Sequence, residues 1–158
     1  MISIVGLGSA ASRIAEKFIS TKNYEVYQLH SGVARKTKYK YKLKEYESPE
    51  DYEKNIPDLR KFFADTIQFI MVGSSYSSNY CLGILEQIKD KKIDLFYVQP
   101  DAELMTGIPK VLDKIAFSVL QEYSRSGLLN SFTPISNVMV EKTIGKLQKF
   151  RRKMALRA

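Results

Sequence analysis

The first twelve residues carry the pattern best suited to chemistry. The apolar run Met1–Val5 leads through two glycines into small residues that begin an amphipathic segment. A strand that turns through glycine into a helix directs free backbone N–H groups and the positive end of the helix dipole at one point, which is suited to phosphate. The candidate phosphate-binding residues are Gly6, Gly8, Ser9, Ala10, Ala11 and Ser12. A tight turn without a ligand is the alternative, because Gly-x-Gly is a common pattern.

A second candidate loop follows the apolar run at residues 66–72. It begins at Gly73 and continues through a serine-rich stretch to Asn79. Backbone N–H groups of Gly73, Ser74 and Ser75 are further candidates for phosphate binding. Because this loop and the first one follow strands, we expect the two to meet at one edge of a sheet.

Two carboxylates follow the apolar run at residues 93–98. Asp101 and Glu103 suit the hydroxyl groups of a ribose, although a loop kept polar for solubility is an equal alternative. No nucleophile stands beside a base in the sequence, and no carboxylate pair has a reason to be close. We therefore predict no catalytic residue.

The elements that must position these loops alternate along the chain. Apolar runs predict strands over residues 1–5, 24–29, 36–44, 66–72, 93–98 and 131–135. Amphipathic spacing predicts helices over residues 9–19, 49–55, 58–64, 79–90 and 109–126, and a last helix from about residue 137. Strands that alternate with helices indicate an α/β fold, a three-layer, doubly wound, mostly parallel, Rossmann-like sheet with ligands beyond the strand carboxyl ends.

The net charge of +8 is unevenly distributed. Arg35–Lys44 carries six cations and residues 142–158 carry seven, without an acid in either, so the other 12 basic residues face 17 acids and the remaining body is net −5. Strict alternation in residues 36–44 predicts a lysine-rich edge strand, where lysines commonly prevent edge pairing. Both Arg35–Lys44 and Lys142–Arg157 also suit a nucleic-acid backbone or an acidic partner. For Lys142–Arg157, a membrane surface or a merely solvated tail is also open.

The length and composition limit which kinds of protein this chain can be. The 158 residues fit one domain, which we place at residues 1–141, followed by a basic helix or tail at residues 142–158. A single cysteine, Cys81, excludes an internal disulfide, and with one histidine, His30, no metal site is expected. No apolar run is long enough for a membrane span and no signal peptide is evident, so we expect a cytoplasmic protein.

Four segments in this order resemble the nucleotide-binding domain of the tubulin/FtsZ superfamily. GLGSAAS at residues 6–12 is similar to its glycine loop, and FIMVGSSYSSNYCLGIL at residues 69–85 is similar to its strand, signature loop and following helix. Residues 93–122 and 131–145 parallel its next strand–helix pairs. The resemblance implies binding of GTP or GDP, with or without magnesium, and self-association into filaments.

The chain departs from that family at the signature loop. The family has glycine and threonine there, whereas residues 74–78 are serines and Tyr76, whose Cβ atoms restrict positive φ angles. The chain also stops before the family's acidic loop, which completes hydrolysis in a neighbouring subunit. The resemblance therefore implies a GTPase only when a partner subunit completes it.

Two other functions remain open. One is a structural or scaffold protein with a degenerate nucleotide site and a basic tail. The other is an NADP-binding reductase domain, because Gly6, Gly8 and Ala11 fit the dinucleotide fingerprint. The predicted second strand ends at His30 without the acid that NAD requires, while Arg35 and Lys36 suit a 2′-phosphate.

Overall fold

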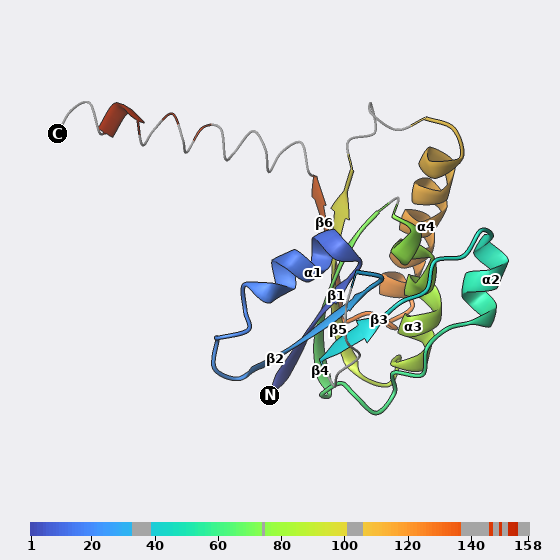
Figure 1. Cartoon of the computed structure of the whole chain (residues 1–158), viewed down its shortest axis with the longest axis horizontal. Helices are drawn as coiled ribbons and strands as arrows, with labels where there is room; N and C mark the ends of the chain where they lie inside the picture. Colours follow the sequence, from blue (N-terminus) through green and yellow to red (C-terminus); the bar gives the residue numbers. More distant parts are fainter. Residues whose placement is uncertain are drawn as a thin grey trace.

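The computed structural model describes residues 1–32, 39–73, 75–100 and 106–136, with Lys146, Lys149 and Arg152–Met154, and leaves out the side chains of Pro109 and Leu112. These residues form an α/β fold (Figure 1). Six strands lie in the order β3-β2-β1-β4-β5-β6, and every neighbouring pair is parallel. The expected α/β, Rossmann-like class is confirmed.

Most strands and the long helix have bounds within two residues of those predicted. The strands are β1 (Ile2–Leu7), β2 (Tyr24–His30), β3 (Lys40–Lys42), β4 (Thr66–Val72), β5 (Lys92–Gln99) and β6 (Ser131–Ser136). The helices are α1 (Ser9–Glu16), α2 (Pro49–Lys54), α3 (Cys81–Gln87) and α4 (Ile108–Arg125), with a 3₁₀ turn, η1, at Tyr76–Tyr80.

The order of strands places a switch point between β1 and β4. From β1 the chain moves outward through β2 to β3, then returns to the other side of β1 and continues from β4 through β5 to β6. The loops after β1 and β4 therefore leave adjacent strands in opposite directions. Ligands of open α/β sheets bind in the crevice at this point.

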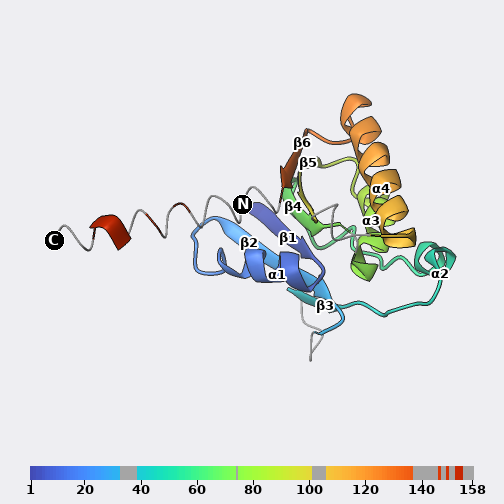
Figure 2. The ribbon, with the colours of Figure 1, turned by 90° about the horizontal axis from the view of Figure 1, so that it is seen from above.

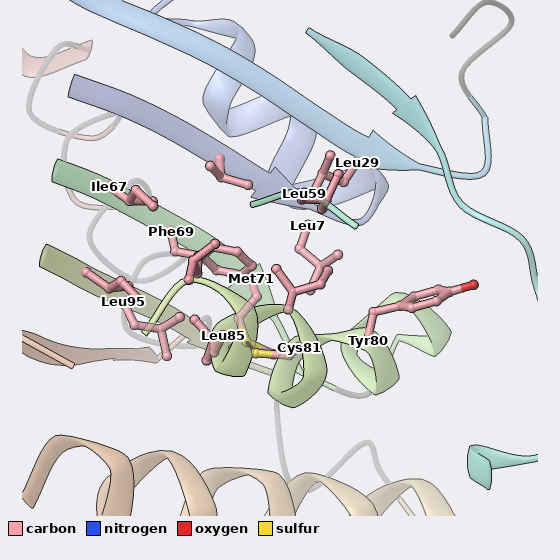
Figure 3. Close-up of a cluster of buried hydrophobic side chains, with 14 of the residues drawn as sticks. Leu7, Leu29, Leu59, Ile67, Phe69, Met71, Tyr80, Cys81, Leu85 and Leu95 are labelled. Carbon is pink, nitrogen blue, oxygen red and sulfur yellow. Dashed lines mark hydrogen bonds between the residues drawn. The ribbon is translucent and has the colours of Figure 1, made fainter. Parts of the chain in front are cut away.

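Helices cover the two faces unequally. Helix α1 lies on one face, while α2, α3 and α4 lie on the other (Figure 2). Alternate residues of β4 serve the two faces: Phe69 and Met71 join the larger cluster, and Ile70 joins the smaller cluster beneath α1. The larger cluster includes Leu7, Cys81 and Leu95 (Figure 3). Burial on both faces explains why β4 is almost entirely apolar.

Two of the expected helical segments differ from the structure. Helix α1 ends at Glu16 because the next turn tightens into i→i−3 bonds, such as Ile19 N–H to the Glu16 carbonyl (3.2 Å). Residues 58–64 form no helix, so that prediction was wrong. Their backbone groups are satisfied by distant side chains instead: Leu59 N–H by Gln87 Oε1 (3.1 Å), the Phe62 carbonyl by Tyr27 (2.6 Å) and Ala64 N–H by Ser3 Oγ (2.8 Å).

The edge and core predictions have mixed outcomes. The lysine-bearing segment does lie at the sheet edge, as β3, and residues 33–38 lie outside the described residues. Cys81 is a core residue, as expected, and its thiol lies 3.1 Å from Met71 Sδ (Figure 3). Part of the apolar stripe of α4 faces outward, since Ile108, Val111 and Ile115 are 74%, 55% and 54% exposed.

The approach of β1 to α1 generates a stability prediction. A Cβ on Gly6 would lie 2.7 Å from the Ala11 carbonyl oxygen and 2.8 Å from Ser12 Cα, and neither backbone atom can move independently. We expect Gly6→Ala to lower the free energy of unfolding by about 3 kcal/mol in urea denaturation. Gly83→Ala is the control, because the three atoms nearest to its added Cβ all belong to the side chain of Ile56 and none to the backbone. An equal loss in the two variants would contradict this explanation.

Candidate functional site

The first loop is reduced to a single residue between strand and helix. Gly8 joins β1 to α1 with φ of 95°, a conformation that favours glycine. Its N–H donates to the Leu29 carbonyl of β2 (2.7 Å), and its carbonyl accepts the Ser12 N–H (2.9 Å). Helix α1 therefore begins directly at the carboxyl end of β1, at the switch point.

The amino end of α1 has unused hydrogen-bond donors. The helix has no side-chain cap and no acidic residue in its first turn. Ser9 and Ala10 are exposed, Ala11 is buried, and no acceptor among the described residues takes the N–H group of any of the three. The first N–H groups of a helix have no partner within it, so these donors and the helix dipole favour an anion here.

The second loop meets the first, as the sequence predicts. A Cβ placed on Gly8 would lie 3.3 Å from Ser77 Cβ and 3.7 Å from Ser75 Oγ. This loop is held largely by its own hydroxyl groups. Ser75 Oγ donates to the Val72 carbonyl (3.3 Å) and Ser78 Oγ donates to the Ser75 carbonyl (2.5 Å).

Tyr76 extends from this loop across the carboxyl end of β1. Its hydroxyl donates to Ser31, which follows β2, and β1 lies between β2 and β4 in the sheet. Tyr80 is anchored in a similar way, by a hydrogen bond to the Lys44 carbonyl. The loop after β4 is therefore fixed at both of its tyrosines to segments beyond β1.

Cations gather at the carboxyl ends of β2 and β3. His30 ends β2, and Lys42 of β3 is its register partner. Burial and the neighbouring charges of Lys40 and Arg13 lower the pKa of His30 below its ordinary value of 6.5. His30 Nδ1 accepts the Gly32 N–H (3.1 Å), so the proton of the neutral imidazole is on Nε2, which remains a donor.

A cavity of about 210 Å³ lies between the carboxyl ends of β4 and β5, the second loop and α4. Tyr97 of β5 is fully buried beside it and donates its hydroxyl to the Asp113 carboxylate of α4. Burial and the carboxylate raise the pKa of Tyr97 well above its ordinary value. A Cβ on Gly73 would overlap both Asp113 and Tyr97, so only glycine lets the three approach.

The candidate residues named from the sequence take different places in this arrangement. Gly6 and Ser12 join α1 to β1, because the buried Ser12 hydroxyl donates to the Gly6 carbonyl (3.2 Å). The Gly8 and Gly73 N–H groups donate to the Leu29 and Val98 carbonyls. Ser9, Ala10, Ala11 and Ser75 lie at the crevice. Ser74, Asp101 and Glu103 lie outside the described residues.

Sequence reasoning missed the pair formed by Tyr97 and Asp113. Its signal in the sequence is weak: Asp113 is one of several charged residues on an amphipathic helix, next to Lys114, and Tyr97 lies within an apolar strand. Within the described ranges no three His, Cys, Asp or Glu side chains gather to hold a metal ion. Among the same residues, no helix combines the length and apolar character needed to cross a membrane.

No protein-family model matches this chain, and a search of curated proteins found no match.

The environment of His30 predicts how stability depends on pH. The folded-state pKa lies below that of the unfolded chain, so protonation favours unfolding. The contribution of neutral His30 is fully present above pH 6.5 and is lost as the pH falls through 6.5 towards the folded-state pKa. Urea midpoints at pH 7.5 and 5.0 should therefore differ less in His30→Gln than in the unmodified protein. Equal pH dependence in the two proteins would refute this.

The buried phenol predicts a second stability effect. Tyr97→Phe leaves the Asp113 carboxylate without its buried donor, and we expect a loss of about 2 kcal/mol in the free energy of unfolding. Tyr24→Phe is the control, because the hydroxyl of partly exposed Tyr24 has no hydrogen bond within the described residues. A loss no larger in Tyr97→Phe than in this control would show that the hydrogen bond is unimportant.

Proposed function

We propose that this domain binds a nucleotide through its phosphates at the amino end of α1. The observation that carries the proposal is the position of uncapped, exposed N–H groups of Ser9 and Ala10 at the switch point between β1 and β4. Phosphates bind at such helix ends because they accept from several N–H groups and interact favourably with the dipole. Arg13, also exposed and on the same helix, adds positive charge nearby.

The proposed ligand is GTP or GDP, on the strength of the resemblance of four segments to the tubulin/FtsZ domain. The meeting of the loops at residues 6–12 and 73–79 supports this proposal. Magnesium, when present, would be held mainly by the phosphates, because the described residues provide no acidic cluster for it.

The same resemblance suggests that the domain acts through self-association. The exposed apolar strip of α4, formed by Ile108, Val111 and Ile115, supports a protein contact on that helix. Hydrolysis of GTP would require residues from a partner subunit. Sedimentation or light scattering with GTP is the test for assembly.

A second candidate, an NADP-binding reductase domain, is favoured by one observation. Arg13, His30, Lys40 and Lys42 surround the end of β2, where an NAD-dependent domain has an acid. The cations named for this purpose from the sequence, Arg35 and Lys36, lie outside the described residues. Calorimetric titration with GTP, GDP, ATP, NADPH and NADH separates the candidates. Absence of binding by all five would favour a scaffold protein and overturn the nucleotide proposal.

One substitution, Ala10→Glu, is expected to change stability and nucleotide affinity in opposite directions. Ala10→Glu places a carboxylate in the first turn of α1, where it should stabilise the helix by about 0.5 kcal/mol through the dipole. The same carboxylate should repel phosphate, so nucleotide affinity should fall more than about tenfold. Ala10→Gln is the uncharged control of nearly equal size. Unchanged affinity in Ala10→Glu would place the phosphates elsewhere.

A further inference from the structure

The cavity beside Asp113 begins close to the phosphate corner. Ser75 lines the cavity and also faces Gly8, at 3.7 Å from the position of an added Cβ. A ligand held by its phosphates at α1 could therefore reach the cavity by passing one side chain. The cavity of about 210 Å³ is smaller than the 300–1,000 Å³ typical of sites that enclose a whole drug-sized ligand, so it fits only part of a nucleotide.

The lining of the cavity differs from the phosphate corner in charge. Its walls are mostly apolar, and none of the described residues that line it is a lysine or arginine. Asp113 accepts the Tyr97 hydroxyl through one oxygen, and its other oxygen has no partner among the described residues. Half-buried carboxylate oxygens retain several acceptor positions, so Asp113 repels phosphate and favours a group with N–H donors.

We propose that this cavity holds the base of the nucleotide and that Asp113 reads a guanine-type edge, on which a ring N–H and an amino group are adjacent. A carboxylate accepts both donors at once, whereas the adenine edge sets an acceptor beside its amino group. Ser75, Ser78 and Asn79 add polar groups at the mouth, and Met71, Leu82 and Leu120 provide apolar contacts for the ring. This inference rests on the proposed nucleotide function and assigns the residue that would distinguish guanine from adenine.

The test compares GDP, IDP and ADP by calorimetric titration of the full chain. IDP lacks the amino group, so we expect about tenfold weaker binding than GDP, and still weaker binding of ADP. In Asp113→Asn the amide oxygen still accepts from Tyr97, while the amide NH₂ opposes the guanine donors. Affinity for GDP should fall about a hundredfold and the preference over ADP should disappear. Asp90→Asn, at an exposed site, is the matched control for charge.

A second variant keeps the test decisive if Asp113→Asn fails to fold. Ala116→Leu fills the cavity without altering Asp113 and should weaken GDP binding at least tenfold. Equal binding of GDP, IDP and ADP, or unchanged affinity in both variants, would overturn the base assignment and leave the phosphate site intact. No binding of any nucleotide to the unmodified protein would overturn the proposed function as well.

Discussion

Much of this structure depends on the close contact between the backbones of β1 and α1. Gly6 leaves no room for a Cβ beside the Ala11 carbonyl and Ser12 Cα. The buried Ser12 hydroxyl donates to the Gly6 carbonyl of β1, and the Gln28 amide of β2 donates to the Ser12 carbonyl of α1. Because the helix is held against the strand in this way, it begins at Ser9, directly at the switch point. The free N–H groups of Ser9 and Ala10 are the consequence, since the N-cap residue is Gly8, which has no side chain to accept from them.

The loop after β4 is held in place differently from the turn between β1 and α1. A glycine-rich loop can wrap a ligand with its own backbone, but serines and tyrosines restrict that freedom. Here the hydroxyl groups of Ser75 and Ser78 satisfy nearby carbonyls, while Tyr76 and Tyr80 reach Ser31 and Lys44. The loop is thus ordered by side-chain hydrogen bonds before any ligand arrives. In the proposed site, this loop would contribute shape, and the phosphate donors would come mainly from α1.

Much of the fold was predictable because patterns within short segments of the sequence determine the strands and turns. Apolar runs located β1, β2, β4, β5 and β6, strict alternation located the edge strand β3, and the glycine spacing located the turn into α1. The failures involve contacts between distant residues. Residues 58–64 lose their helix to hydrogen bonds with Tyr27, Gln87 and Ser3, and α4 turns its apolar strip outward because Asp113 pairs with Tyr97 while Phe117 packs on Phe132. No periodicity within one segment reports such partners, and for the same reason the cavity beside Asp113 could not be foreseen.

The two sides of the second loop differ in polarity, and this difference limits how a ligand can lie. Towards β2 and β3, Arg13 and Lys40 give a positive edge, whereas Asp113 on the α4 side gives an acceptor without a cation among the described residues that line the cavity. A molecule with a phosphate at one end and N–H donors at the other is favoured in only one orientation, because reversal would set anion against carboxylate. Tyr76 connects the two sides, since it lines the cavity and bonds to Ser31. In the proposed site, charge would therefore determine the orientation of such a ligand before any base-specific contact is made.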